Sequence, residues 1–363
     1  MVQKEVLILA STEELNAWCD AQGPSDRIAV DTEGDSLHCY FEKLCLIQLS
    51  VSDQDLIVDP LCGLDFKCFN QFLLERMAVF QGCDYDLRML RRGAGFVPGA
   101  VFDTYLAARL LGIKEVGLAS LVKNFFGLDL PKSSQKANWA RRPLTPVMLE
   151  YAINDTKYLL PLADRLETQL REINRWSWYE ESCTRAVAAT AEDRERDPER
   201  VWKVSGSAVL SPRGLAVLRE LWFWRDGEAQ KVDRPTFQVM RNEELIELAK
   251  SAVSGDKVRP PSWLPSARRR RLEETIERAL EIPESDWPQR AKSVRVRSSP
   301  EQEQRLDRLR AKRDAVSNEL GLDPAIVASR SILEAVSREP ASAPKMLMDW
   351  QRELLGVHEG GIS

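Results

Sequence analysis

The chain has 363 residues, 44% of them hydrophobic and 29% charged, with a formal net charge of −5 at pH 7. Such a composition is ordinary for a globular protein with two or three domains. No apolar run reaches the roughly 18 residues that a membrane span needs, and the acidic balance argues against indiscriminate binding to polyanions. A surplus of basic residues within 201–300 still allows a local phosphate-binding surface.

The seven cysteines predict reduced thiols in a cytoplasmic protein. Their number is odd, none forms a C-x-x-C pair, and six of the seven fall within the first 83 residues. This pattern in a long chain is unlike the disulfide frameworks of small secreted domains. The first residues, MVQKEVLILASTEEL, carry only a short apolar patch followed by acids, which predicts a strand and not a secretory signal.

Short apolar segments predict strands in the first hundred residues. They are VLIL (6–9), RIAV (27–30), LCLIQLSV (44–51), DLIVD (55–59) and MAVFQG (77–82). Helices are predicted at 11–22, where Ser11 or Thr12 would cap the first turn, at 64–76 and from Asp84 onward. The pattern is helical from 103 to about 190, so we predict an α/β domain with a mixed sheet flanked by helices.

The rest of the chain is predicted to form two small all-α modules. The plan is an α/β domain at 1–190, a linker at 191–204, a helical domain at 205–291, a second linker at 292–304, a second helical domain at 305–356 and a flexible tail at 357–363. Residues 191–200 have almost no apolar side chains, as a linker requires. Residues 256–271 are predicted as a Pro-rich basic loop before a further helix.

Acidic residues follow or lie on three of these predicted elements. Asp31 and Glu33 come at the end of the strand at 27–30, where period two puts both side chains on one face. Asp86 follows the strand at 77–82, and Tyr151 and Asp155 share one face of a helix at i, i+4 spacing. Carboxylates that gather in one cleft repel one another, and divalent cations with oxygen ligands are their natural compensation.

Each of these signals has an ordinary explanation when it is taken singly. A D-x-E after a strand also occurs in solvated loops, and an Asp at a helix start also acts as a cap. A Tyr and an Asp at i, i+4 also form a hydrogen bond across one helical turn. The order of the three signals along the chain is what makes their combination specific.

The three segments IAVDTEG, QGCDYDLRML and YAINDTKYLL resemble the exonuclease motifs of the DEDD superfamily, in its tyrosine branch. The surrounding LCLIQLS, VFDTYLAARLLG and NWARRPLTPVMLEYAINDTKYL resemble the ribonuclease D family, over about residues 5–175. The resemblance implies a ribonuclease H-like α/β fold and metal-dependent 3′→5′ hydrolysis that releases nucleoside 5′-monophosphates. The alternative branch needs a histidine five residues before the last aspartate, and neither His38 nor His358 has an aspartate at that distance.

The family pattern implies a role for each catalytic residue and two divalent cations, Mg²⁺ or Mn²⁺. It implies that Asp31 bridges both ions, that Glu33 and Asp155 hold the first and that Asp86 holds the second. Tyr151 would orient the attacking water. Two such ions clamp the attacking and leaving oxygens in phosphodiester hydrolysis.

Substrate-side residues are predicted from their neighbourhood to these motifs. Leu37 and His38 follow the metal-binding strand and would line the pocket of the terminal nucleotide, and Met89 would pack on a base. Arg142 would meet a phosphate. Ordinary packing is the alternative for the first three, and a structural ion pair is the alternative for Arg142.

Three further acids are predicted to lie outside the metal site. Asp84 is interpreted as a helix cap, Asp103 as the start of the next helix and Asp35 as a solvated bystander. The sequence also departs from the family pattern at Gly34-Asp35 and at Gln81-Gly82-Cys83, which bears on substrate contacts because the metal-binding acids themselves match.

The segment SPRGLAVLRELWFWRDGEAQKVDRPTFQVMRNEELIELA resembles the HRDC helical domain, and 305–336 fits a second copy more loosely. Trp222, Phe223 and Trp224 cannot all be buried by one helix, which leaves one for a base or for an interdomain contact. The Arg268–Arg271 cluster is a phosphate-contact candidate, with a solvated charge run as the alternative.

Together these features predict a monomeric, cytoplasmic, ribonuclease D-like 3′→5′ exoribonuclease that acts on structured RNA such as tRNA precursors. One alternative is a DNA-directed exonuclease of the same superfamily. The other is a non-catalytic nucleic-acid-binding protein with a relict nuclease fold. The complete set of four acids and Tyr151 argues against the relict, which would have no chemical reason to keep it.

Overall fold

The computed structural model describes most of the chain, which divides into two compact units. It describes residues 6–23, 26–52, 54–131, 134–192, 197–255, 258, 260–289, 299–358 and 361–362. The first unit draws on 1–34, 44–193 and 295–363, and the second on 35–43 and 194–294. Among the described residues, no helix is both long and apolar enough to cross a membrane.

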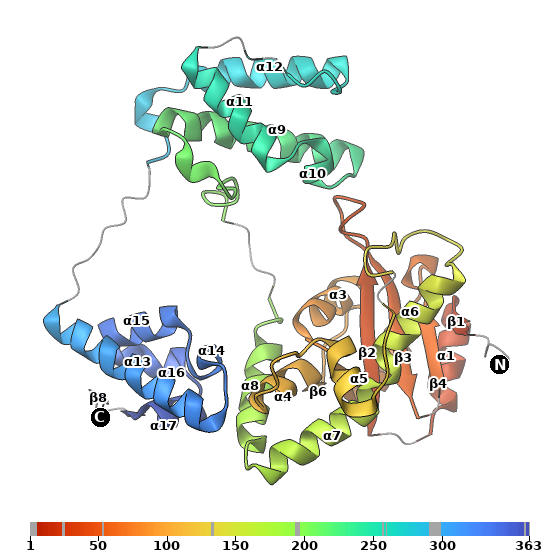
Figure 1. Cartoon of the computed structure of the whole chain (residues 1–363). Helices are drawn as coiled ribbons and strands as arrows, with labels where there is room; N and C mark the ends of the chain where they lie inside the picture. Colours follow the sequence, from red (N-terminus) through yellow and green to blue (C-terminus); the bar gives the residue numbers. More distant parts are fainter. Residues whose placement is uncertain are drawn as a thin grey trace. The chain divides into compact units, whose positions relative to one another are not determined.

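A six-stranded mixed sheet forms the centre of the first unit (Figure 1). Its strands are β1 (Leu7–Leu9), β2 (Arg27–Gly34), β3 (Leu44–Val51), β4 (Gln54–Val58), β5 (Met77–Phe80) and β6 (Ala100–Asp103). Their order is β1-β4-β3-β2-β5-β6. β3 is antiparallel to both β2 and β4, and the other neighbours are parallel. The mixed sheet predicted from the sequence is therefore confirmed.

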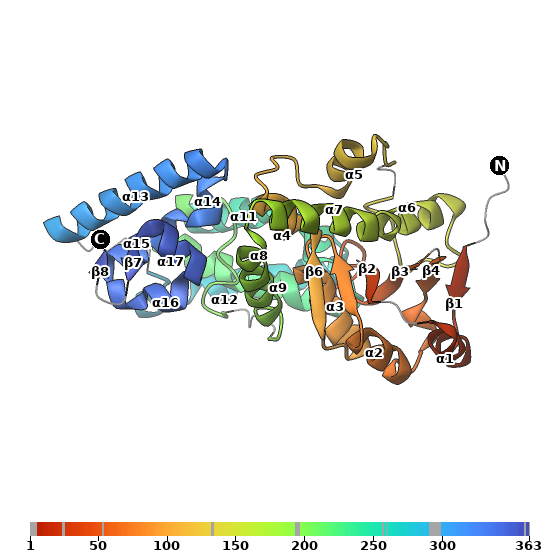
Figure 2. The same cartoon turned by 90° about the horizontal axis from the view of Figure 1, so that it is seen from below.

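Helices cover both faces of this sheet. They are α1 (Thr12–Ala21), α2 (Lys67–Leu74), α3 (Asp84–Ala94), α4 (Thr104–Leu110), α5 (Leu118–Phe126), α6 (Pro146–Lys157), α7 (Leu159–Glu172) and α8 (Trp176–Ala188), with a short 3₁₀ turn η1 (Pro60–Cys62). Figure 2 shows α1, α2 and α3 on one face and α6 and α7 on the other. Alternate residues of β2 serve the two layers, since Ile28 packs with the α1–α3 side and Ala29 with the α7 side.

Two strands differ from the prediction. β2 continues through Asp31 and Glu33 to Gly34, because these residues pair in register with Gln48 and Leu46 of β3. Strand pairing depends on main-chain hydrogen bonds, which form whether the side chains are polar or apolar. The strand therefore continues beyond the end of the apolar run. β6 was not predicted, because its three apolar residues run directly into the helical pattern that begins at 103.

The carboxylate of Asp103 joins three elements at one end of the sheet. It caps α4 by accepting the N–H of Tyr105 at 2.8 Å, as predicted for the start of that helix. It also accepts the N–H groups of Gly82 (2.9 Å) and Cys83 (3.0 Å) in the turn between β5 and α3. Asp103 is itself 3% exposed, so these bonds lie in the interior, where they fix how α3 leaves the sheet.

The C-terminal helices also belong to the first unit. They are α13 (Pro300–Leu320), α14 (Pro324–Val327), α15 (Arg330–Arg338), α16 (Ala343–Met346) and α17 (Asp349–Leu355), with a 3₁₀ turn η4 (Pro340–Ser342). Trp350 of α17 stacks on Trp178 of α8 with ring centroids 4.9 Å apart. The predicted flexible tail contains two paired strands, β7 (Val357–His358) and β8 (Gly361–Ile362), because Val357 is buried against the helices.

The second unit is a helical bundle that also holds a segment from the start of the chain. Its helices are α9 (Pro212–Val232), α10 (Thr236–Val239), α11 (Asn242–Ser254) and α12 (Ser266–Leu280), with 3₁₀ turns η2 (Ser207–Val209) and η3 (Glu284–Asp286). Residues 35–43 belong to it, since the Asp233 carboxylate accepts the N–H groups of Tyr40 (3.0 Å) and Phe41 (3.1 Å). The Tyr40 hydroxyl donates to Asp226 at 2.9 Å. Of the three consecutive aromatics of α9, only Phe223 is exposed, at 43%.

The arginine cluster predicted as a basic loop is part of helix α12 instead. Arg268 and Arg271 lie one turn apart and both bind the buried Glu228 of α9, at 3.1 and 2.6 Å. These contacts lower the pKa of Glu228 to about 2. Arg270 pairs with Glu274, and Arg269 donates to the main-chain carbonyls of residues 262 and 264. The cluster therefore stabilises the bundle, a role that neither sequence interpretation anticipated.

We expect Asp103→Ala to lower the free energy of unfolding by about 2–4 kcal/mol, because four buried or partly buried main-chain donors lose their acceptor. Urea denaturation followed by circular dichroism measures the loss. Asp129→Ala is the matched control: this aspartate is exposed and pairs only with Lys123, so we expect a change of about 0.5 kcal/mol or less. Equal stabilities for the two variants would contradict the role given to Asp103.

Candidate active site

Three carboxylates meet where β2 faces α6. The carboxylate oxygens of Asp31, Glu33 and Asp155 all lie within 4.8 Å of one another. Asp31 and Glu33 are two residues apart on β2 and so share one face, and Asp155 approaches that face from α6. Helix α6 begins at Pro146 and is capped by Thr145, whose hydroxyl accepts the N–H of Met148. The prediction that these three acids gather is thus confirmed by the geometry.

The fourth predicted acid, Asp86, stands beside this group in the first turn of α3. Its Oδ1 accepts two hydrogen bonds from Thr32, from the main-chain N–H at 3.0 Å and from the hydroxyl at 2.6 Å. Thr32 lies between Asp31 and Glu33 on β2, and its side chain therefore points to the opposite face, toward α3. Strand β2 therefore lies close to Asp155 of α6 on one face of the sheet and binds Asp86 of α3 on the other.

Tyr151 lies one helical turn before Asp155 on the same face of α6. Its ring also packs against the buried indole of Trp139, with centroids 6.0 Å apart. Burial and the nearby acids raise the pKa of the Tyr151 hydroxyl, so the phenol stays protonated near neutral pH. It can therefore donate a hydrogen bond but cannot act as an anionic base.

Burial is the main electrostatic cause at this site, and mutual repulsion adds to it. Desolvation raises the pKa of Glu33 to about 9 and that of Asp155 to about 7, with further increases from the neighbouring carboxylates. The pKa of Asp86 rises to about 6 despite its two bonds from Thr32, and the pKa of Asp31 is raised well above its ordinary value by burial, Asp86 and Asp155. Because burial and repulsion oppose the simultaneous ionisation of these four acids, positive charge is needed nearby for all four to be ionised.

The donor set fits divalent cations. Carboxylate oxygens are hard ligands, which Mg²⁺ and Mn²⁺ prefer. Among the described residues no lysine or arginine forms an ion pair with any of the four acids, so the protein supplies no cation of its own there. Asp31, Glu33 and Asp155 lie close enough to share one ion, and Asp86 has one carboxylate oxygen outside its bonds with Thr32.

The sequence interpretation missed one buried polar residue at this site, Gln48. It lies on β3 directly opposite Asp31 in the antiparallel pair with β2. Its side chain is fully buried, and neither amide atom has a hydrogen-bond partner. The signal was present in LCLIQLSV, where Gln48 is the only amide in an otherwise nearly apolar run. Thr32 was missed too, because nothing in the sequence indicates that a threonine between two acids binds a third acid.

The structure places the substrate-side candidates in different settings. Leu37 is 44% exposed, and His38 is partly exposed in the same segment of the second unit. Met89 is 2% exposed in the core, which favours the packing alternative. Arg142 pairs with Asp59 through two bonds of 2.6 Å and also donates to the Trp139 carbonyl, which favours the structural ion pair. Contact of any of them with a nucleotide stays a prediction.

Two of the bystander acids differ in detail from their interpretation. Asp84 is the first residue of α3 and pairs with Arg88, while Cys83 occupies the cap position. Asp35 is 2% exposed and not solvated: its Oδ1 accepts the N–H of Lys43 at 2.8 Å and its Oδ2 lies 3.6 Å from the Lys43 ammonium. Both acids thus have local structural partners, which fits their exclusion from the metal site.

Known proteins are similar to this chain in sequence and in fold. A family model described as 3′-5′ exonuclease matches residues 7–171, and an HRDC domain model matches residues 214–254. Ribonuclease D of Pseudomonas paraeruginosa is 31% identical over 343 residues, which cover 91% of this chain and 90% of the relative. Ribonuclease D of Xanthomonas oryzae is 31% identical over 349 residues, with 94% of each chain covered.

Solved structures agree with these matches. The catalytic core of RRP6 from Trypanosoma brucei has a TM-score of 0.66 at 28% identity, over 77% of this chain and 81% of that chain. Escherichia coli RNase D has a TM-score of 0.70 at 24% identity, over 97% and 99% of the two chains, which shows a common fold. The resemblance inferred from the three motifs is confirmed.

The raised pKa values give the metal-free protein a particular pH dependence. Because Glu33 and Asp155 bind protons more tightly in the folded chain than in the unfolded chain, their contribution to stability is fully present below about pH 4. It is lost as the pH rises through about 7 and then about 9. Relief of the repulsion, by a substitution or by a bound cation, should therefore stabilise the fold most above pH 7.

We expect Asp31→Asn to raise the free energy of unfolding of the EDTA-treated protein by about 1–3 kcal/mol at pH 8, and by much less at pH 5. Thermal and urea unfolding at both pH values measure it. Mn²⁺ should stabilise the wild type more than Asp31→Asn, and Asp84→Asn is the exposed control with little change in either condition. A wild type that stays more stable than Asp31→Asn at pH 8 in EDTA would disprove the repulsive cluster.

Proposed function

We propose that this chain, which belongs to the ribonuclease D family, is a metal-dependent 3′→5′ exoribonuclease that trims structured RNAs such as tRNA precursors. The observation that carries the proposal is the meeting of Asp31, Glu33 and Asp155 within 4.8 Å, with Asp86 beside them and no cation from the described protein residues. The full length of the similarity to ribonuclease D, through both the exonuclease and the HRDC matches, supports the same activity.

Each residue has a defined chemical task in this proposal. Asp31, Glu33 and Asp155 would hold one cation, and Asp31 and Asp86 a second, in the arrangement that the family implies. The cations supply positive charge for the phosphate and lower the pKa of a bound water toward neutral pH. Thr32 keeps Asp86 turned toward β2 with two hydrogen bonds. Desolvation by the packed layers strengthens every charge interaction in the site.

Tyr151 is proposed to orient the attacking water and not to take its proton. Its phenol is protonated near neutral pH because burial and the acids raise its pKa. Tyr151 is one helical turn from Asp155 on the same face of α6, so its hydroxyl lies on the side of the helix that carries a proposed metal ligand. A positioned donor of this kind fixes the geometry of attack, which lowers the barrier without a change of charge.

RNA is proposed as the substrate over DNA because of the named relatives. The E. coli neighbour is described as an exoribonuclease involved in structured RNA processing. The exposed Phe223 of the HRDC match offers one aromatic face for a base. The seven free cysteines fit the reducing cytoplasm that we propose as the location. The monomeric state is part of the same proposal.

The decisive experiment follows a 5′-labelled RNA strand and a DNA strand of equal sequence on denaturing gels, with Mg²⁺, with Mn²⁺ and with EDTA. We expect stepwise shortening of the RNA from its 3′ end, release of nucleoside 5′-monophosphates and no cleavage in EDTA. Asp31→Asn should lower kcat/KM by about 10³-fold or more, because one ligand of both proposed cations is weakened. Asp84→Asn should keep full activity.

Tyr151→Phe separates the roles within the site. We expect its kcat to fall about 10- to 100-fold with Mn²⁺ affinity unchanged, because the phenyl ring keeps the packing on Trp139 and loses only the hydroxyl. Faster cleavage of DNA than of RNA would favour the DNA-directed alternative. RNA binding without cleavage in any metal would favour the non-catalytic binding protein.

A further inference from the structure

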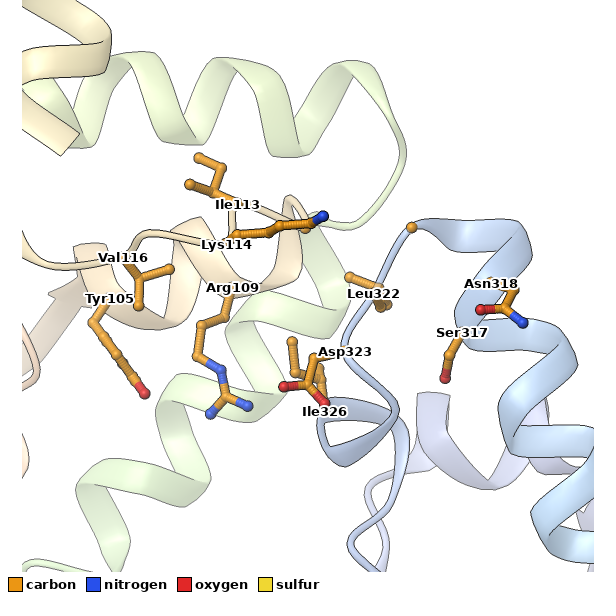
Figure 3. A pocket seen from close by; sticks show the side chains of 12 residues that line it. Tyr105, Arg109, Ile113, Lys114, Val116, Ser317, Asn318, Leu322, Asp323 and Ile326 are labelled. Atoms are coloured by element: carbon orange, nitrogen blue, oxygen red, sulfur yellow. The ribbon is translucent and has the colours of Figure 1, made fainter. Parts of the chain in front are cut away.

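A pocket of about 660 Å³ lies in the first unit, where α4 and the segment after it meet the end of α13 and α14 (Figure 3). The exonuclease side contributes Tyr105, Arg109 and Lys114, and the C-terminal helices contribute Asn318 and Asp323. None of these residues belongs to the acidic cluster. The pocket is thus a second concave, polar site built from segments about 200 residues apart in the sequence.

Two cations in this pocket have no acidic partner. Neither Arg109 nor Lys114 forms an ion pair within the described part of the chain. The Arg109 guanidinium lies 5.6 Å from the centroid of the Tyr105 ring. This cation–π contact brings no negative charge that would neutralise the guanidinium. Figure 3 shows the Asp323 side chain in the same part of the pocket as the Arg109 guanidinium, although the two form no ion pair. That carboxylate caps α14 by accepting the N–H of Ala325 at 2.8 Å.

The walls of the pocket are fixed by close main-chain contacts. Arg175 is 9% exposed and donates to the carbonyl of Leu110 at 2.7 Å and to that of Leu320 at 2.8 Å, so it ties together the ends of α4 and α13. A Cβ at Gly112 would lie 2.4 Å from the carbonyl oxygen of Gly321. The two segments therefore touch backbone to backbone, and the cations stand on a preformed surface.

One hydrogen bond connects the pocket with the proposed catalytic site. The side-chain amide of Gln81 donates to the carbonyl of Val116, which lines the pocket, at 2.7 Å. Gln81 lies in the turn between β5 and α3, five residues before Asp86. The turn that leads to Asp86 and the wall of the pocket are therefore in direct contact.

We propose that this pocket binds a backbone phosphate of the RNA strand whose 3′ end occupies the acidic site. The inference rests on the proposed function and adds a place for the RNA outside the metal centre. Arg109 supplies a positive charge beside the aromatic face of Tyr105, and Lys114 adds positive charge at another part of the pocket lining, where Figure 3 shows its side chain pointing in a different direction. A free nucleotide offers the same phosphate chemistry, so the test distinguishes the two.

The test measures binding of a fluorescein-labelled single-stranded RNA by anisotropy in EDTA, where no cleavage takes place. Arg109→Ala/Lys114→Ala should weaken binding at least about 10-fold at low salt and reduce the slope of log K against log salt by about 0.7, the value for one phosphate contact on a single strand. Lys123→Ala/Arg171→Ala removes the same charge from exposed positions of this unit and is the matched control. Asp323→Asn keeps the cap on α14 and should tighten binding.

The possible outcomes distinguish a failure of the pocket proposal from a failure of the proposed function. Equal losses in the test and control variants would overturn the pocket, even if the wild type cleaves RNA. Competition by AMP that displaces RNA from the wild type, and loses its effect in Arg109→Ala/Lys114→Ala, would overturn the RNA strand in favour of a free nucleotide. A wild type that neither binds nor cleaves RNA would overturn the proposed function together with this inference.

A second inference concerns Gln48, whose buried amide has no partner. A buried amide left without hydrogen bonds costs about 1–3 kcal/mol, and folded proteins keep few of them. An apolar side chain of similar shape would fill the same space on β3 without that cost. The residue is therefore expected to serve something that the metal-free chain does not contain.

The surroundings of Gln48 are those of the acidic site. It is paired with Asp31 on β2 and with Ile57 on β4, so it shares their face of the sheet. Two residues further along β3 the hydroxyl of Ser50 donates to that of Thr156 at 2.8 Å, and Thr156 directly follows Asp155 on α6. Gln48 thus faces the helix that carries the proposed metal ligand.

The geometry points to Gln48 as a positioning residue for Asp31. Its amide is placed to donate to that carboxylate once divalent cations bind and hold it ionised. A metal ligand that accepts such a bond is oriented by it, and loss of such a partner lowers metal affinity about 10- to 100-fold in other sites. The inference shares no observation with the pocket between α4 and α14.

Gln48→Met distinguishes this role from mere packing. We expect the EDTA-treated variant to be more stable than the wild type, because the orphaned amide is gone, while Mn²⁺ binding measured by calorimetry weakens about 10-fold. Ile57→Met changes an apolar neighbour on the same face and should leave Mn²⁺ affinity unaltered. Unchanged Mn²⁺ affinity in Gln48→Met, or an equal loss in Ile57→Met, would overturn the inference.

Discussion

The repulsion among the carboxylates of Asp31, Glu33, Asp86 and Asp155 is the constraint on which the rest of the first unit depends. Asp31 and Glu33 lie on one face of β2, and Thr32 between them holds Asp86 from the other side. A loop would let the acids separate and hydrate, which would remove their raised pKa values and their need for cations. Pairing of Asp31 and Glu33 with β3 does not allow this, so the repulsion between the carboxylates persists until positive charge offsets it.

The helices that carry Asp86 and Asp155 are also held in place by hydrogen bonds. Asp103 holds the turn before α3, and the Ser50–Thr156 pair holds α6 one residue after Asp155. These bonds are needed because the acids favour separation, and a helix free to shift would relieve the repulsion by moving away. Preorganisation in the metal-free chain thus rests on ordinary capping and cross-element contacts, and not on the acids themselves.

The sequence predicted what depends on local pattern and on motif order. The mixed sheet, the HRDC match and the gathering of Asp31, Glu33 and Asp155 are confirmed, because apolar periodicity and fixed spacings carry that information. It failed where the partner is distant in the chain. Arg268 and Arg271 were interpreted as phosphate contacts or a solvated run because Glu228 lies on another helix. Asp35 was interpreted as solvated because its burial depends on the segment that follows it, and Gln48 was missed because its neighbour Asp31 comes from the adjacent strand.

The helical regions are not simple appendages to a nuclease domain. The segment 35–43, which follows the acidic strand directly in the sequence, has its hydrogen-bond partners at Asp233 and Asp226 of the HRDC-containing unit. Helix α17, from the far end of the chain, stacks Trp350 on Trp178 of α8 within the first unit. Deletion of everything after residue 200 would therefore expose Trp178 and leave the Tyr40 segment without its carboxylate acceptor. Single side-chain substitutions, which keep these contacts, are for this physical reason the sound way to separate RNA binding from hydrolysis in this protein.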